Sequence, residues 1–414
     1  MLGRKKRLLI TLLTIIVIVS AIGAGALLTS VPDQLQIAKN SPLGLYPCNP
    51  NVIWEKTFGG TGDDRAYYAA NVNDGSIVVG SSTSFEPGKT NACIVRLDKD
   101  GNQLWNRTYS ENMGTEFRYI SIVQDGFVLV GNTFLPSGII NGFVMQIDRQ
   151  GNPMWNVTLE ASEGINKLFS AVQDGNNIVV SGLTQPQDGN GTSQTWFVKL
   201  DAYGNVLWNK TYLNSSNSAA RAITLTRDKG YLAAGYINMN GNANIEFLAL
   251  KIDSNGNLLW NKTYGGPQSD MAYAVTSAIN GYIIAGNTYS YGAGDSDAWI
   301  IKINLNGDLL WNKTLGGKDF DSPSFITQSN DGTYLIAGTT FSFGNGYRDF
   351  WLFKIDDSGK VLWNCTVGRS EYEEAYAVLP VDGDDFVVAG WTNSLGAGGR
   401  YDFYIVKINV ALNF

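Results

Sequence analysis

The sequence contains no histidine and only three cysteines among its 414 residues. Without histidine, the chain cannot carry a Ser-His-Asp or Cys-His triad, an imidazole-bound zinc ion or a histidine-bound haem. Cys48, Cys93 and Cys365 lie far apart without a CxxC pair, and we expect each to be an unpaired thiol. EF-hand, Walker and G-x-S-x-G motifs are absent as well. We therefore predict no catalytic residue, no metal ion and no cofactor.

Positive charge is also scarce beyond the first few residues. The formal net charge is −7, and charged residues make up 16% of the chain. Because nucleic-acid binding depends largely on Lys and Arg, we expect no nucleic-acid partner. The 47 glycines and the 12% of aromatic residues instead indicate a folded protein that is rich in turns.

The N-terminus differs from the rest of the chain. A basic cluster at 3–7 precedes an uncharged apolar run at 8–28, close to the roughly 20 residues that span a bilayer. The positive-inside rule then places the rest outside the cytoplasm. An A-x-A site at Ala24–Ala26 would suit a cleaved signal peptide, but the run is long for one, and we favour an anchor. We predict a membrane anchor or signal peptide at 1–29, a Pro-containing spacer at 30–50 and one folded domain at 51–414, secreted if the N-terminal segment is cleaved.

The folded part is a sevenfold repeat built around motifs such as "GDLLWNKTLGG" at 307–317. The motif tryptophan recurs every 50–53 residues, at Trp54, Trp105, Trp155, Trp208, Trp260, Trp311 and Trp363. A glycine column keeps step with it, at Gly80, Gly131, Gly182, Gly235, Gly286, Gly338 and Gly390. A basic or amide column does the same, at Arg96, Gln146, Lys199, Lys251, Lys302, Lys354 and Lys407.

Each repeat predicts four short strands. The segments are rich in Val, Ile, Tyr, Trp and Thr and are bounded by Gly, Asn or Asp, and none shows a sustained helical period. Four-stranded repeats of this length are typical of β-propellers. We predict an all-β, seven-bladed β-propeller in which the N-terminal strand at 51–58 completes the last blade beside the strand at 402–409.

The motif Asp/Asn-x-x-Gly-x-x-x-Trp-Asn-Lys-Thr-x-Gly-Gly, with its "DGGY"-like turns and "AGxT", resembles the repeat of bacterial and archaeal β-propeller proteins of the SBBP type. It is also similar to the tryptophan repeat of PQQ-like, quinoprotein-type propellers. The resemblance covers 51–414 and implies the propeller fold. It does not fix a function, because such propellers range from enzymes to binding platforms.

The motif residues themselves suggest structural roles. We expect the tryptophan to wedge between blades, against the space freed by the glycine column, and the basic residue two positions later to protect the edge of the outermost strand. The asparagine after the tryptophan lies in a glycosylation sequon in most copies. The predicted glycan acceptors are Asn106, Asn156, Asn190, Asn209, Asn214, Asn261, Asn312 and Asn364.

Variable loops are where we expect function. The second-to-third strand loops and the links between repeats vary, and in a four-stranded meander both sets lie on one rim. Aromatic residues in these loops are the predicted ligand-binding residues, namely Phe85, Tyr289, Tyr291, Phe341, Phe343 and Tyr347. The rim also carries acids that we expect to cap turns and add solubility, namely Asp63, Asp64, Glu116, Glu163, Asp270, Asp319, Asp321, Glu371 and Glu373. A polar residue that recurs before the third strand, such as Asp297, predicts a hydrogen bond that anchors this strand.

Three functions remain open. The favoured one is a membrane-anchored, extracytoplasmic binding or scaffold module for a protein or glycan at the cell surface, docked on the loop-rich face. A carbohydrate-active hydrolase or lyase would need two carboxylates roughly 5 to 9.5 Å apart in the central depression. A PQQ-type oxidoreductase is less favoured, because the adjacent cysteine pair that such enzymes often use is missing.

Overall fold

The computed structural model describes residues 50–86, 88–111, 113–187, 191–214, 216–238, 244–396 and 400–410. The predicted anchor and all but the last residue of the predicted spacer lie outside these ranges. Every regular element in the described part is a β-strand, which confirms the all-β prediction. No helix there is long and apolar enough to cross a membrane.

The strands follow one another at short intervals along the chain. The first fourteen are β1 (Asn51–Phe58), β2 (Asp64–Val72), β3 (Gly75–Ser82), β4 (Asn91–Asp98), β5 (Gln103–Tyr109), β6 (Gly114–Val123), β7 (Gly126–Phe134), β8 (Ile140–Ile147), β9 (Pro153–Leu159), β10 (Gly164–Asp174), β11 (Asn177–Pro186), β12 (Gln194–Leu200), β13 (Val206–Tyr212) and β14 (Asn217–Leu225). The next fourteen are β15 (Tyr231–Asn238), β16 (Glu246–Ile252), β17 (Leu258–Tyr264), β18 (Asp270–Ala278), β19 (Gly281–Thr288), β20 (Asp297–Asn304), β21 (Leu309–Leu315), β22 (Asp321–Gln328), β23 (Tyr334–Thr340), β24 (Asp349–Ile355), β25 (Val361–Val367), β26 (Glu373–Pro380), β27 (Asp385–Thr392) and β28 (Asp402–Asn409).

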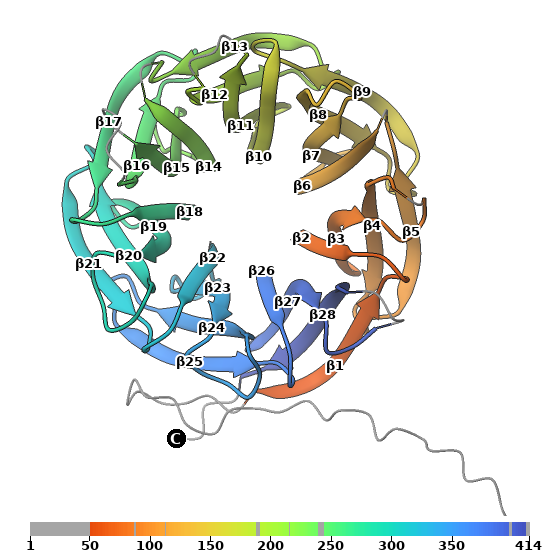
Figure 1. Cartoon of the computed structure of the whole chain (residues 1–414), viewed down its shortest axis with the longest axis vertical. Coiled ribbons are helices and arrows are strands. Elements are labelled where there is room, and N and C mark those ends of the chain that lie inside the picture. Colours follow the sequence, from red (N-terminus) through yellow and green to blue (C-terminus); the bar gives the residue numbers. More distant parts are fainter. Residues whose placement is uncertain are drawn as a thin grey trace, which may run out of the picture. The chain divides into compact units, whose positions relative to one another are not determined.

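Consecutive strands pair into antiparallel sheets. Four strands each form the sheets β2–β5, β14–β17, β18–β21 and β22–β25, and the same order occurs in β6–β9 and β10–β13, which are joined by a parallel bridge between Ile140 and Ile165. The sheet of β26–β28 has β1 as its fourth strand, with Trp54 opposite Lys407. Figure 1 shows the sheets arranged around a central opening, each with its first strand innermost, which is the arrangement of a β-propeller.

The hydrophobic core lies between neighbouring sheets. One cluster joins Ile77 and Ile94 of the β2–β5 sheet to Phe117, Leu129 and Phe143 of the β6–β9 sheet. The middle strands are buried on both faces because each face packs against another sheet, whereas most fourth strands consist mainly of exposed and half-buried residues. This explains why the middle strands read as continuous apolar runs.

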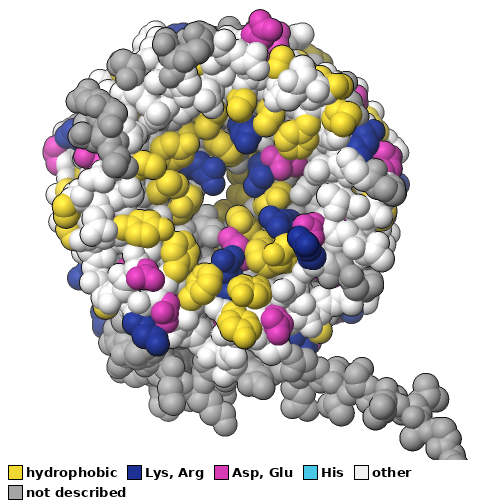
Figure 2. All heavy atoms as spheres, viewed as in Figure 1, with side chains coloured by type: hydrophobic (Ala, Val, Ile, Leu, Met, Phe, Trp, Pro, Cys, Tyr) yellow, Lys and Arg dark blue, Asp and Glu magenta, His cyan; other side chains and the backbone are white. Residues whose placement is uncertain are grey.

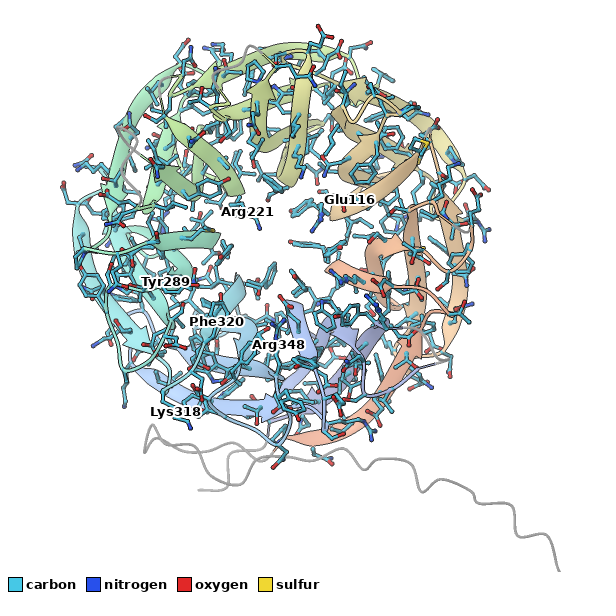
Figure 3. All side chains as sticks on the ribbon, viewed as in Figure 1. Glu116, Arg221, Tyr289, Lys318, Phe320 and Arg348 are labelled. Carbon is cyan, nitrogen blue, oxygen red and sulfur yellow. The ribbon has the colours of Figure 1, made fainter. Side chains whose placement is uncertain are left out.

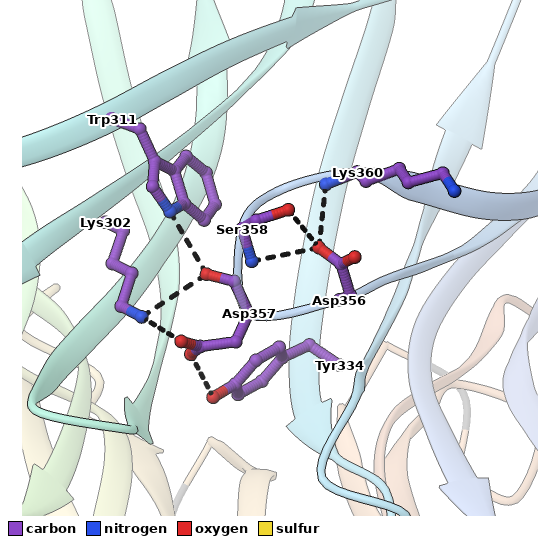
Figure 4. Close-up of polar contacts among 7 residues, drawn as sticks. All are labelled: Lys302, Trp311, Tyr334, Asp356, Asp357, Ser358 and Lys360. Atoms are coloured by element: carbon purple, nitrogen blue, oxygen red, sulfur yellow. Dashed lines mark hydrogen bonds and ion pairs between the residues drawn. The ribbon is translucent and has the colours of Figure 1, made fainter.

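The tryptophan of each fourth strand reaches the next sheet, as Trp311 shows (Figure 4). Its indole Nε1 donates to the backbone oxygen of Asp357 at 3.2 Å. The Asp357 carboxylate accepts bonds from Lys302 Nζ at 2.5 Å and from the Tyr334 hydroxyl at 3.0 Å. Trp311 and the column residue Lys302 thus meet at one turn of the neighbouring sheet. Column residues such as Lys251 and Lys354 instead pair with an acid of their own sheet.

The glycine behind this contact is not the one that the sequence suggested. A Cβ on Gly359, whose φ is 79°, would lie 3.0 Å from the Trp311 ring, so the indole packs on the turn between the third and fourth strands. Trp363 faces the sheet in which β1 is the fourth strand, and it packs on Phe386 with ring centroids 5.7 Å apart. The inter-sheet wedge is confirmed. Its predicted seat on the glycine column of Gly80 is wrong.

The basic residue two positions after the tryptophan lies on the fourth strand, as predicted. Lys262 also crosses to the next sheet, where its Nζ is 2.6 Å from the Asp308 carboxylate. Both side chains of this pair are well exposed. The lysine therefore covers a strand edge and adds a weak contact between sheets.

Candidate functional site

The innermost strands share one irregularity, a β-bulge that faces the centre. Against its second strand, each first strand skips one residue in register. The residues at the bulge are Tyr67, Arg118, Phe169, Arg221, Tyr273, Ser324 and Tyr376. A bulge redirects a side chain, and this one recurs at the same place in every repeat.

The glycine column explains how the bulge fits. A Cβ on Gly182 would lie 1.8 Å from the backbone oxygen of Lys167, and one on Gly390 would lie 1.9 Å from that of Glu374. The second strand therefore needs glycine where the bulged backbone approaches it. Glycines such as Gly182 shape the inner wall and do not receive the tryptophan.

All seven bulge residues line one central pocket of about 560 Å³. Its wall also contains the aromatic residues Tyr68, Tyr119, Phe320 and Phe325, and the charged residues Arg348 and Glu374. Figure 2 shows a hollow at the centre of the viewed face, surrounded by apolar and basic side chains. In size and in its mixture of rings and a few polar groups, the pocket is typical of ligand sites.

The charges of the pocket wall are three arginines and one glutamate. Arg118 lies 2.8 Å from Glu116, just outside the wall, and Arg348 lies 2.5 Å from Glu374. Burial opposes the charge of Arg118, but the Glu116 carboxylate more than offsets this and raises the Arg118 pKa. These two arginines are neutralised by neighbouring carboxylates.

Arg221 differs, because no carboxylate pairs with it among the described residues. Its guanidinium lies over the rings of Phe169 and Tyr273, at 4.5 and 5.6 Å from their centroids. Burial lowers the Arg221 pKa, and the charge of Arg118 acts in the same direction, yet an arginine stays protonated at neutral pH. Figure 3 shows Arg221 at the central opening. A half-buried cation held by two rings is poised for an anion.

Three tyrosines of the wall, Tyr68, Tyr119 and Tyr376, stay neutral. Burial raises the pKa of Tyr376, and the Glu374 carboxylate, which accepts the Tyr376 hydroxyl bond at 2.9 Å, raises it further. Burial likewise raises the pKa values of Tyr68 and Tyr119, whose ring centroids are 4.3 Å apart. These phenols can donate hydrogen bonds and stack, but they do not supply a base at neutral pH.

None of the six predicted ligand-binding aromatics lines the central pocket. Phe85, Tyr289, Tyr291 and Tyr347 are 56%, 43%, 43% and 63% exposed on the loop-rich rim. The ring centroids of Phe341 and the pocket residue Phe320 are 5.7 Å apart, so this rim residue adjoins the pocket. A ligand role for all six residues stays a prediction. Sequence reasoning missed the bulge residues, which can be found 13 or 14 positions before each column glycine.

The variable loops do share one rim. The residue before the third strand of one sheet bridges to the start of the next sheet, as between Ser296 and Phe320 and between Arg348 and Tyr372. The Asp297 carboxylate accepts the backbone N–H groups of Ala293 at 2.8 Å and Gly294 at 3.2 Å, so the predicted anchoring bond is confirmed.

The acids of this rim do more than add solubility. Asp64, Asp270, Asp321 and Glu373 are each at most 1% exposed and accept a backbone N–H from the link before their strand. Turn capping is confirmed for these four, and a solubility role is wrong for them. No group of three or more acids or cysteines that could hold a metal ion occurs within the described ranges.

The sequon asparagines of the motif lie on the fourth strands. Asn106, Asn156, Asn209, Asn261 and Asn312 are exposed, and so is Asn214 in its loop. Asn364 is only 3% exposed, which makes it a poor acceptor in the folded chain. Asn190 lies outside the described residues. Glycosylation of these positions stays a prediction.

The cysteines do not behave alike. Cys93 is a free, buried thiol, as expected, and burial raises its pKa to about 12. Cys365 is in a disulfide, so the prediction of an unpaired thiol is wrong there. Cys48 lies outside the described residues.

Known proteins support the fold and the repeat. The WD40 domain of Neurospora crassa Pan2 has a TM-score of 0.50 at 10% identity, over 89% of this chain and 93% of that one. A periplasmic gluconolactonase of Pseudomonas aeruginosa has a TM-score of 0.49 at 13% identity, over 74% of this chain and 85% of that one. No curated protein sequence matches the chain. Residues 141–389, more than half of the chain, match the family described as outer membrane protein assembly factor BamB, and the chain therefore belongs to this family of PQQ-like propeller repeats.

Proposed function

We propose that the chain is a seven-bladed β-propeller, closed by β1, that binds an anionic ligand in its central pocket outside the cytoplasm. The N-terminal segment would hold it at the membrane, and the ligand would be a glycan or a protein group at the cell surface. The observation that carries the proposal is Arg221, a cation in the pocket wall without a carboxylate partner among the described residues.

The physical argument concerns the cost of an unpaired charge. Burial weakens the hydration of the Arg221 guanidinium, and the rings of Phe169 and Tyr273 offset only part of that loss. A carboxylate ligand would restore charge-assisted bonds, which guanidinium groups form in a bidentate geometry. The net charge of −7 for the whole chain makes this basic interior a local feature of the pocket.

Catalysis by paired carboxylates finds no support in the pocket. Glu374 is the single acid in its described wall, and it is engaged by Arg348 and by the Tyr376 hydroxyl. A glycosidase needs a second carboxylate across the scissile bond. Binding is therefore the function that the pocket chemistry favours.

Two features support an extracytoplasmic location. The disulfide of Cys365 is of a kind that persists in oxidising compartments and is rare in the cytosol. The basic cluster and apolar run at 3–28 predict export with the folded part outside. Topology can be tested by adding a membrane-impermeant amine reagent to intact cells, which should label exposed lysines of the folded part such as Lys318.

The ligand proposal is tested with D-galacturonate and D-galactose, which differ by one carboxylate. The full-length protein in detergent should bind galacturonate, measured by calorimetry, and should bind galactose much more weakly. Arg221→Gln should abolish the preference, whereas Arg149→Gln, which removes the same charge from an exposed turn, should keep it. Equal binding of both sugars, or an unchanged Arg221→Gln variant, would contradict the proposal.

A further inference from the structure

A second group of arginines and rings lies on the loop-rich rim beside the central pocket. We call it the rim strip, and it consists of Arg65, Phe341, Tyr347, Arg348, Tyr372, Trp391 and Tyr401. The Arg65 guanidinium carbon lies 4.5 Å from the Tyr401 ring centroid and 5.6 Å from that of Trp391. The Arg348 carbon lies 4.5 Å from the Phe341 centroid and 5.9 Å from that of Trp391. Trp391 is thus the buried floor between two cations.

The rim strip is continuous with the pocket. Arg348 lines the pocket and belongs to the strip, and the pocket residue Phe320 packs on Phe341 with centroids 5.7 Å apart. Phe320 and Arg348, both labelled in Figure 3, each contact the Phe341 ring. A ligand that fills the pocket could therefore extend over the strip and remain in contact with the protein surface.

Backbone hydrogen bonds hold the strip in place. The N–H of Asp64 donates to the Tyr401 oxygen at 2.7 Å, and the N–H of Glu373 donates to the Arg348 oxygen at 2.8 Å. Tyr347 and Tyr372 stack at 5.5 Å with their planes 15° apart, and Tyr347 remains 63% exposed. The strip is thus a preorganised surface with one well exposed ring, that of Tyr347, and preorganisation lowers the entropic cost of binding.

The charges of the strip favour an acidic ligand. Arg65 is 38% exposed in its side chain, and its nearest carboxylate, that of Asp63, is 4.0 Å away and 37% exposed. Such a loose, hydrated pair gives little stability and can exchange its partner. Arg65 and Arg221 are then two cations open to ligand, one on the strip and one in the pocket.

We infer that the ligand is an acidic polysaccharide of the uronate class, held by its sugar rings along the rim strip and by one carboxylate at Arg221. An exposed ring such as that of Tyr347 suits the C–H face of a sugar, and a polymer with repeated carboxylates can meet both open cations. This inference rests on the proposed function, because it assigns the ligand class of the same pocket and extends it over the rim.

The test compares galacturonate with its hexamer, using the full-length protein in detergent. With affinity expressed per galacturonate residue, the hexamer should bind at least about tenfold more tightly than the monomer. Arg65→Gln and Tyr347→Ala should each weaken hexamer binding about five- to tenfold and leave monomer binding unchanged. The controls are Arg149→Gln and Tyr203→Ala, which alter an exposed arginine and an 80% exposed tyrosine in other turns.

The outcomes separate the two proposals. If the monomer binds through Arg221 but the hexamer binds no more tightly, the rim strip is not part of the site and the proposed function stands. If neither monomer nor hexamer binds, the proposed function fails as well. If polyglutamate binds as tightly as the hexamer and Tyr347→Ala has no effect, the uronate assignment is overturned in favour of an acidic peptide.

Discussion

Neighbouring sheets meet at the loop-rich rim in seams of two different chemistries. In each seam a residue at the start of a third strand lies near the start of the next sheet's first strand. Acid seams hold two carboxyl groups, in the pairs Glu246 with Asp270, Asp297 with Asp321, Asp349 with Glu373, and Asp402 with Asp64. Neutral seams hold amides or hydroxyls, as in the pairs Asn141 with Asn166 and Thr195 with Ser218. In the remaining neutral seam the N–H of Thr115 donates to the backbone oxygen of Thr90.

The difference lies in how the polar atoms are satisfied. In a neutral seam, the Asn166 amide donates to Asn141 Oδ1 at 3.1 Å and accepts the Thr184 hydroxyl at 2.7 Å. In an acid seam, Asp349 Oδ2 accepts two backbone N–H groups, but its Oδ1 has no donor within the described part of the chain. Two carboxylates supply only acceptors, so an acid seam is best satisfied when it holds a proton.

The acid seams also explain the double glycine of the repeat. In them a glycine follows the fourth strand, at Gly59, Gly265, Gly316 and Gly368, where the neutral seams have Ser110, Glu160 and Leu213. A Cβ on Gly316 would lie 1.9 Å from Asp297 Oδ1 and 3.0 Å from Asp321 Oδ2. The same backbone arrangement therefore accommodates both acid and neutral seams. Only the acid seams require a glycine after the fourth strand, and only they respond to pH.

The largest expected effect comes from filling the glycine position of an acid seam. Gly316→Val would push a side chain into both carboxyl groups and should lower the free energy of unfolding by roughly 3 kcal/mol or more. Glu160→Val, at the matching exposed position of a neutral seam, should change it by less than about 0.5 kcal/mol. Urea denaturation of the two variants measures the contrast. Equal losses would mean that the glycine does not serve the acid pair.

The acid seams should make the protein more stable in mild acid than above neutrality. Burial and the neighbouring Glu373 raise the pKa of Asp349 to about 7, and burial and Asp64 raise that of Asp402 to about 6. These pKa values exceed the unfolded value near 3.9, so the folded state binds extra protons between these limits. Stability from both groups is complete below about pH 4 and is lost as the pH rises through 6 to 7.

Carboxyl groups whose pKa values are lowered in the folded state set the lower pH limit of this stable range. A hydrogen bond from Lys354 holds the pKa of Asp331 at about 2 in spite of burial, so the stability from that pair is lost only as the pH falls below about 4. The urea midpoint should therefore be higher at pH 5 than at pH 8. The corresponding difference in the free energy of unfolding should be on the order of 1–4 kcal/mol. A midpoint that rises steadily from pH 5 to pH 8 would rule out protonated seams.

The sequence predicts much of this frame but not its chemistry. Segments rich in β-branched and aromatic residues, bounded by turn residues, locate the sheets together with the tryptophan column. The reason for Gly182 was misassigned, because only the paired strands show that a bulged backbone approaches it. Arg221 was missed because the residue at the bulge position differs in type from repeat to repeat. A position without a shared residue type does not stand out when the repeats are aligned. The acid pairs are equally hidden, since Asp349 and Glu373 come from different sheets.

Exchanging the chemistry of two seams should exchange their pH response. Asp349→Asn lets the side-chain oxygen keep its backbone bonds while the NH₂ group donates to Glu373, which gives the seam a donor as Asn166 does for Asn141 in the neutral seam. The variant should gain on the order of 2 kcal/mol over the natural protein at pH 8 and little at pH 5. Asn166→Asp should lose stability at pH 8 and recover part of it at pH 5. Parallel pH profiles for all three proteins would show that the seams do not titrate.

The smallest expected effect concerns the buried threonines that serve each kind of seam. The Thr340 hydroxyl donates to Asp321 in an acid seam, and the Thr184 hydroxyl donates to Asn166 in a neutral one. A bond to a charged acceptor is worth about 1.5–3 kcal/mol and one to a neutral acceptor about 0.5–1.5 kcal/mol. Thr340→Val should therefore cost about 1 kcal/mol more than Thr184→Val at pH 8. Urea titrations of both variants at pH 8 measure this difference, and equal costs would mean that the charge of the acid seam does not strengthen the threonine bond.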